Sequence, residues 1–395
     1  MKRQFELDFL GQYYAVIINE KQTGVFSIAV HLKDNLNHKI LKQALADLVH
    51  RFPFLIGGLR SNFFWYEYEI TNGTLPLIPI EKISDPISSE QVFRLLYGER
   101  HFITEVSHLL CDGRTLSKIT RALVIRYFEI LGINPSDTDK AIFDESLHPE
   151  ELENAYLRFA NTKIKKTDAQ PKTSVYHPPT SENSPARTLT FKLSANKVKA
   201  EAKAYEVTVS EFLLTLILKS VAVERAAFKR DEPITASIPI DCRAFFPSKT
   251  MRNFVSAQTI TMPEGEDFIT MMKQLQMEFK KIDKHSVLED FSAYQKTYQL
   301  ARYLPRKLKN WYMKRMSTLE SIKHTTGFSN IGKIDFSETV LNHLDYMEFF
   351  ISLEEAPYYF SCVTAGNILT LTVTLRTDTN VMVEELENNL NKFVV

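Results

Sequence analysis

Two apolar patterns with different periods meet near residue 110 of the chain. Residues 102–108 follow the two-residue period of a strand, which places alternate side chains on one face: Phe102, Thr104, Val106 and His108. Residues 116–130 instead follow a helical period, and Gly132 is a typical helix stop. The pattern predicts a strand that ends at His108 and a helix that opens at Asp112.

The same two periods recur in both halves of the chain. Helical spacing predicts helices over residues 40–49, 195–205, 210–228 and 383–393, the first of them stopped by Pro53. A hairpin is expected to turn at residues 365–367. Residues 163–186 are polar, rich in Pro, Ser and Thr, and without period. We therefore expect an N-terminal lobe over 1–165, a linker over 166–186 and a C-terminal lobe over 187–395.

An aromatic stripe lies in the first half of the chain. The alternation of NFFWYEYEI predicts a strand whose one face carries Phe64, Tyr66, Tyr68 and Ile70. Such a stripe is typical of core packing, and the wall of a substrate pocket is the alternative.

The junction of strand and helix carries a compact chemical motif. The run VSHLLCDG places His108 four residues before Asp112 and five before Gly113. An imidazole with an ordinary pKa of about 6.5 can accept a proton at neutral pH, so His108 is a candidate general base. From the spacing alone, His108 can equally be a hydrogen-bonded structural residue, Asp112 a helix N-cap and Gly113 a turn residue.

SHLLCDG resembles the HxxxDG active-site motif of a superfamily of acyltransferases. Its members include chloramphenicol acetyltransferases, condensation domains of nonribosomal peptide synthetases, plant acyltransferases and alcohol acetyltransferases. Three further segments are similar to this family and follow in its order: residues 36–59, 237–256 and 327–336. The resemblance spans almost the whole chain.

Departures from the family favour its alcohol acetyltransferase-like branch. Peptide-forming condensation domains usually carry a second histidine where this chain has Ser107, and the DFGWG segment of the plant enzymes is absent from the sequence. Chloramphenicol acetyltransferases are about half as long and build their sites between the subunits of a trimer. The resemblance thus implies an α/β fold with two chloramphenicol-acetyltransferase-like lobes in one chain, an active-site tunnel between them, and a monomer.

The resemblance also implies an activity and site residues. The activity is transfer of an acyl group from a coenzyme A thioester to an alcohol or amine, with His108 as general base, no acyl-enzyme and no metal. Asp112 is expected to pair with Arg243 and so to support the site with Gly113. Ser329 and Asn330 are candidate oxyanion or substrate contacts, or else residues that cap their strand. The alternatives are a condensation-type enzyme that uses carrier-protein thioesters and a catalytically silent binding homologue.

Basic residues near these motifs are candidates for the phosphates of coenzyme A: Lys249, Arg252 and Lys333. Ordinary surface charge is the alternative for each of them. No residue is assigned to permanent cofactor binding.

Composition restricts the remaining classes of function. Of 395 residues 44% are hydrophobic, and 48 Lys and Arg balance 48 Asp and Glu, so no net field favours nucleic acid or an anionic membrane. The sequence has no secretory signal core and no run long enough to span a membrane, which predicts a cytoplasmic protein. Three cysteines show no zinc spacing, and Cys111 is expected to be a small buried residue rather than a nucleophile.

Overall fold

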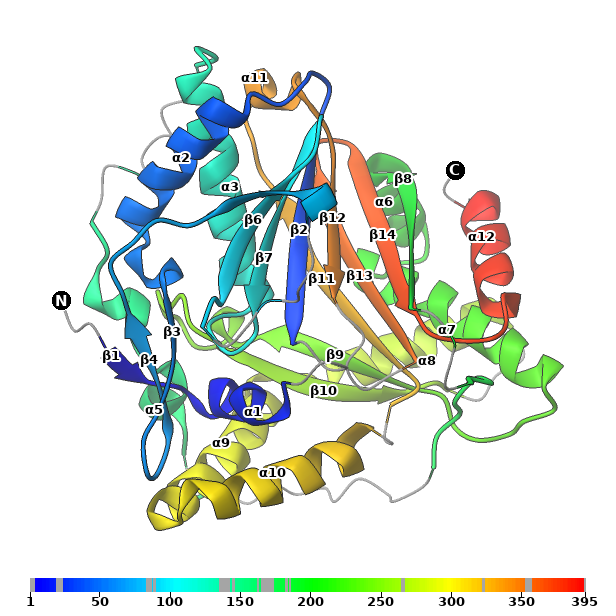
Figure 1. Cartoon of the computed structure of the whole chain (residues 1–395). Helices are drawn as coiled ribbons and strands as arrows, with labels where there is room; N and C mark the ends of the chain where they lie inside the picture. Colours follow the sequence, from blue (N-terminus) through cyan, green and yellow to red (C-terminus); the bar gives the residue numbers. More distant parts are fainter. Residues whose placement is uncertain are drawn as a thin grey trace.

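Two large sheets and one small sheet, surrounded by helices, form the computed structural model of the chain (Figure 1). The larger sheets have five and six strands, and the small one has three. The residues that the structure describes are 4–18, 24–82, 87, 90–134, 143, 146–161, 163–164, 174–181, 184, 186–263, 267–321, 324–351 and 357–393.

The five-stranded sheet contains β7, the strand that leads to His108. Its strands follow the order β12-β2-β7-β6-β5, and helices α2 and α3 lie together over one of its faces (Figure 1). Phe102, Thr104 and Val106 of β7 are all fully buried, as the period predicts. The elements are β2 (Val25–Leu32), β5 (Leu77–Pro79), β6 (Phe93–Tyr97), β7 (His101–Ser107), β12 (Leu344–Ile351), α2 (His38–Arg51) and α3 (Gly113–Ile130).

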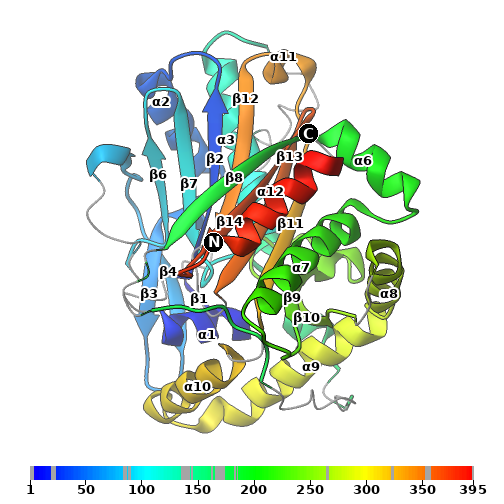
Figure 2. The same ribbon diagram turned by 90° about the vertical axis from the view of Figure 1, so that its right-hand side faces the viewer.

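The six-stranded sheet belongs to the second half of the chain. Its strands follow the order β10-β9-β11-β13-β14-β8, and α7 and α12 lie side by side against it (Figure 2). Gly366, with φ 57°, turns the hairpin between β13 and β14 as predicted. The elements are β8 (Arg187–Ser194), β9 (Thr235–Asp241), β10 (Val255–Thr261), β11 (Thr326–Ile334), β13 (Tyr358–Ala365), β14 (Ile368–Leu375), α6 (Ala195–Ala204), α7 (Val209–Ala227), α8 (Phe268–Lys280) and α12 (Val381–Phe393).

Strand β12 connects the two halves. It comes from the second half of the sequence but pairs antiparallel with β2 of the first sheet, with Phe349 opposite Ile28. On its other side, the hydroxyls of Ser361 in β13 and Thr370 in β14 donate to backbone carbonyls of β12. The boundaries at 165 and 187 stay a prediction, and much of the predicted linker lies outside the described residues.

The three-stranded sheet and its neighbouring helices form one end of the molecule. The sheet has the order β1-β4-β3, and α9 and α10 lie next to α1 at this end in both views (Figures 1 and 2). The elements are β1 (Gln4–Glu6), β3 (Gly57–Ser61), β4 (Tyr66–Ile70), α1 (Phe9–Ile17), α5 (Ala155–Phe159), α9 (Lys284–Leu300), α10 (Arg306–Ser321) and, at the opposite end, α11 (Glu338–Leu341).

The predicted elements are present, with one correction within the aromatic stripe. Tyr68 and Ile70 of β4 are buried in the core as expected, but Phe64 precedes the strand and is exposed. The helices α1, α8, α9 and α10 were not predicted from the sequence. No helix among the described residues is both long and apolar enough to cross a bilayer.

Candidate active site

His108 lies directly after β7, where the chain leaves the sheet. Its backbone N–H donates to the carbonyl of Gly24 at 2.7 Å, and the residues on either side of it are buried. The imidazole stacks on Tyr14, with ring centroids 4.4 Å apart and planes 9° apart, and meets the ring of Phe26 at its edge. The ring is therefore held between two aromatic walls while remaining partly exposed.

Asn253 determines which imidazole nitrogen carries the proton. Its amide nitrogen donates to the backbone carbonyl of His108 at 2.9 Å and faces Asp8 Oδ1 at 3.4 Å, and both of these atoms are acceptors. The amide oxygen must then be the atom that lies 3.0 Å from His108 Nδ1. Nδ1–H donates to this oxygen, so the lone pair of the neutral ring is on Nε2, as in a general base.

Burial lowers the pKa of His108 below its ordinary value of 6.5. The negative charge of Asp112 and the hydrogen bond to Asn253 act in the opposite direction and only partly offset it. The imidazole is consequently neutral at neutral pH and ready to accept a proton.

Asp112 is both the N-cap of α3 and a buried anion with every oxygen engaged. Oδ1 accepts from the backbone N–H of Thr115 at 3.0 Å, and Oδ2 accepts from Arg243 and from the backbone N–H of Phe254, each at 2.9 Å. Burial raises the pKa of Asp112, but the charge of Arg243 and the two amide bonds outweigh it, and the pKa is lowered. Asp112 is a structural anion that faces the second half of the chain.

The structure contains the Asp112–Arg243 ion pair that the resemblance implies, but the guanidinium does not meet the carboxylate bidentately. Arg243 Nη1 is shared between Asp112 and Asp241, at 2.9 Å each. The Nε and Nη2 atoms donate instead to the carbonyls of Thr250 and Arg252. One cation thus fixes both the start of α3 and the loop that carries Asn253.

Gly113 lies close to side chains from the second half of the chain. Its φ is not positive, but a Cβ at this position would lie 3.2 Å from Ile331 of β11 and 3.4 Å from the ring of Phe349. The motif therefore begins α3 at the point where strands from the second half come closest.

The two candidates in β11 differ in what their side chains do. Asn330 uses its amide for structure: its nitrogen donates to Ser210 at 3.1 Å and its oxygen accepts from the N–H of Gly332. These bonds hold the irregular register of β11 between Asn330 and Lys333. Ser329 is buried opposite Ser361 of β13, which leaves its hydroxyl as the better candidate of the two.

Burial removes two other residues from the catalytic candidates. Cys111 is fully buried, and burial together with the charge of Asp112 raises its pKa well above the usual value, so it is a neutral thiol. Arg252 is also buried, where it donates to the carbonyl of Glu6 and lies 3.4 Å from Asp8. It is not the surface phosphate contact that its sequence position suggested. Lys249 and Lys333 are exposed and lie next to Glu150 and Asp335.

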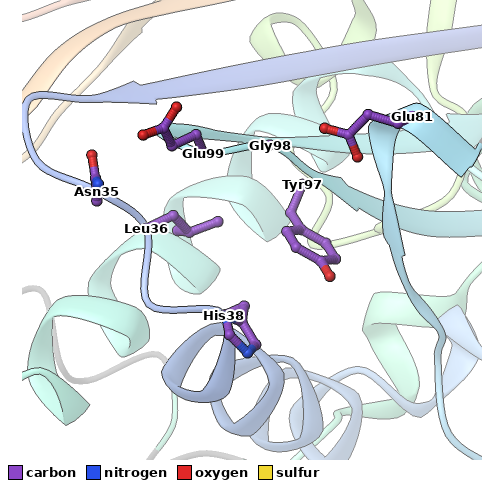
Figure 3. A pocket seen from close by; sticks show the side chains of 7 residues that line it. All are labelled: Asn35, Leu36, His38, Glu81, Tyr97, Gly98 and Glu99. Carbon is purple, nitrogen blue, oxygen red and sulfur yellow. The ribbon is translucent and has the colours of Figure 1, made fainter.

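A hollow of about 300 Å³ lies at the other end of the first sheet (Figure 3). Its lining includes His38, Glu81, Tyr97 and Glu99. The backbone N–H of Gly98, which lines the hollow, donates to the carbonyl of His101 at the start of β7. His108 lies just after the other end of this strand. At about 3.3 Å per residue, the length of β7 separates the hollow from the imidazole.

Three neighbours of His108 were missed in the sequence: Asp8, Tyr14 and Asn253. Asp8 caps α1 through the N–H of Gly11, and a helix N-cap in the sequence gives no indication of a distant partner. Asn253 lies in the segment 237–256 that is similar to the family, but no role was assigned to it from the sequence. Its contact with His108 spans 145 residues of sequence, which no local period encodes.

Comparisons with known proteins give matches at the level of structure. No protein-family model and no curated protein matches the chain. Polyketide synthase associated protein 5 from Mycobacterium tuberculosis has a TM-score of 0.67 at 13% identity, over 98% of this chain and 96% of that one. The condensation domain of the monacolin K polyketide synthase MokA has a TM-score of 0.60 at 12% identity, over 98% and 96%. The chain has the condensation-domain fold.

A third structure with the condensation-domain fold was solved with a ligand. F. sporotrichioides TRI101, in complex with coenzyme A and T-2, has a TM-score of 0.64 at 13% identity and is covered over 99% of both chains. The two-lobed α/β fold that the resemblance implies is thereby confirmed.

The buried pair predicts a non-additive loss of stability. Arg243→Ala should lower the free energy of unfolding by about 3–5 kcal/mol, because it leaves the buried Asp112 without its counter-charge. Asp112→Ala should lower it by less, because Arg243 keeps its contact with Asp241. The double variant should lose far less than the sum. Urea unfolding measures all three, with the exposed pair Glu278 and Lys281 as a control that should change little. Additive losses would show that the pair is not coupled.

The contact with Asn253 predicts two opposite shifts in the His108 pKa. Asn253→Leu removes an acceptor that favours the charged ring, so the pKa should fall further. Asn253→Asp keeps an acceptor at Nδ1 and adds negative charge, so the pKa should rise. NMR titration of the imidazole measures both, and shifts in the same direction would contradict the hydrogen bond.

Proposed function

We propose that the protein transfers an acyl group from a coenzyme A thioester to an alcohol or amine, with His108 as general base. The observation that carries this proposal is the contact of 3.0 Å between His108 Nδ1 and the Asn253 amide oxygen, which leaves Nε2 as the basic nitrogen of a half-buried, neutral imidazole. A neutral ring with a free Nε2 is what a general base needs.

The chemistry proceeds by direct attack. His108 Nε2 takes the proton from the acceptor hydroxyl or amine as its oxygen or nitrogen bonds to the thioester carbonyl carbon. The tetrahedral oxyanion then collapses, the carbon–sulfur bond breaks, and the thiolate recovers the proton from Nε2. General base catalysis of this kind contributes about 10² to 10⁴ in rate.

The remaining residues of the site orient the imidazole or stabilise the oxyanion. Asp112, Gly113 and Arg243 fix the turn that aims the imidazole, and the Ser329 hydroxyl donates to the oxyanion, a contact that is typically worth about 2.7–4 kcal/mol. The substrates reach His108 through a tunnel between the lobes, and the enzyme works as a monomer in the cytoplasm. The relative solved with coenzyme A supports this choice of donor.

A carrier-protein thioester is the second candidate donor. It is favoured by the condensation domains among the structural neighbours, which match over nearly their whole length. A catalytically silent homologue is disfavoured, because His108, Asp112 and Gly113 are all present with their supporting contacts.

Replacement of the base tests the mechanism directly. His108→Ala should reduce thiol release by about 10²-fold or more, while the thermal melting temperature stays near that of the parent. His101→Ala, at the other end of β7, is the matched control and should keep its activity. In the parent, the acid limb of kcat/KM should lie below the ordinary imidazole value of about 6.5, because burial lowers the pKa of His108. Equal activity of His108→Ala and parent would refute the proposal.

The donor is tested by removing its nucleotide. Free acyl-CoA should be accepted with a KM in the common range of about 1 μM to 1 mM. An acyl-pantetheine should react far less efficiently below saturation, because it lacks the phosphates that contribute binding energy. If the two donors perform equally and an acyl carrier protein is preferred over both, the donor is carrier-bound.

A further inference from the structure

Helix α10 turns two cations towards the protein and several apolar residues towards solvent. The inward face carries the buried Lys309, whose ammonium lies 3.1 Å from the centre of the Trp65 ring, and Arg306, whose guanidinium lies over Tyr66. The outward face carries the exposed apolar residues Leu308 49%, Trp311 62% and Tyr312 49%, and Leu304, 44% exposed, lies just before the helix. This arrangement is the reverse of an ordinary surface helix, whose apolar stripe faces the core.

The exposed apolar surface continues beyond α10. Leu300 at the end of α9 and Tyr303 after it are 75% and 79% exposed. The tip between β3 and β4 adds Phe63, 69% exposed, and Arg306 binds this tip through the carbonyls of Asn62 and Phe63. We call these side chains the aromatic face: Phe63, Phe64, Leu300, Tyr303, Leu304, Leu308, Trp311 and Tyr312.

Positive charge accompanies the aromatic face. Residues 291–319 contain seven Lys and Arg and no Asp or Glu, although the whole chain has a formal net charge of zero. Of these cations Lys296, Arg302, Lys307, Lys314 and Arg315 are exposed. Exposed cations therefore accompany the exposed Leu, Tyr and Trp side chains of this segment.

We propose that the aromatic face binds the surface of an anionic phospholipid bilayer. Trp and Tyr side chains are suited to the boundary between lipid headgroups and acyl chains, and nearby Lys and Arg are attracted to anionic lipids. A bilayer can cover side chains that project from the surface, whereas a protein partner needs a groove that matches them. The charge is complementary to anionic lipid and unfavourable for a second copy of the same face.

The helix can enter the interface without losing its place on the protein. The contacts of Lys309 with Trp65 and of Arg306 with Tyr66 lie on the inward side. None of the aromatic-face residues belongs to the proposed catalytic site. The inference therefore stands whether or not the chain transfers acyl groups.

Vesicle binding tests the proposal with the full chain. The protein should float with vesicles that contain phosphatidylglycerol in phosphatidylcholine, and bind pure phosphatidylcholine at least tenfold more weakly. Leu308→Ser, Trp311→Ser and Tyr312→Ser together should weaken binding at least tenfold, since these side chains are exposed and their loss leaves the fold intact. Lys307→Glu with Lys314→Glu should weaken binding and reduce its dependence on salt.

Matched controls come from other helices. Ile269→Ser with Met277→Ser in α8, both exposed apolar residues, and Lys199→Glu with Lys203→Glu in α6 should leave vesicle binding unchanged. The proposal is overturned if the control and face variants behave alike, or if neutral and anionic vesicles bind equally. It is also overturned if vesicles are not bound and the triple variant instead converts a dimer in solution to a monomer, which would assign the face to a second copy.

Discussion

The buried contact between Asp112 and Arg243 holds the candidate site together. One carboxylate begins α3, accepts from Arg243 and accepts from the N–H of Phe254, so the helix and the loop of residues 250–254 have a common anchor. That loop delivers Asn253 to His108. The imidazole is therefore oriented by the second half of the chain although it belongs to the first, and an isolated strand and helix would not reproduce the site.

Sequence periods and the family motif together predicted a large part of this arrangement. Strand, turn and helix around His108 follow from local spacing, because apolar periodicity reports directly which face is buried. Arg243 was found only through the resemblance, since nothing local connects it to Asp112. Asn253 contacts both His108 and Asp8 across long stretches of sequence, and only the folded chain brings them together.

Helix α10 was missed in the sequence for a physical reason. In α10 the apolar period is present but faces outward, so a rule that places apolar residues in the core would have oriented the helix backwards. The formal net charge of zero also gave no indication of this segment, because it conceals the run of residues 291–319, which contains Lys and Arg but no Asp or Glu. Phe64 was wrongly placed in a strand because the alternation of the sequence continues before Tyr66, where β4 begins.

The position of β12 also affects the order in which the protein can fold during synthesis. Strand β2 bonds β7 on one edge, but its other edge pairs with residues that the ribosome adds about 320 positions later. At roughly 5–20 residues per second, that edge waits on the order of 16–64 s for its partner. An apolar strand edge left open for that time is a template for pairing with other chains, and β12 removes this template once it emerges.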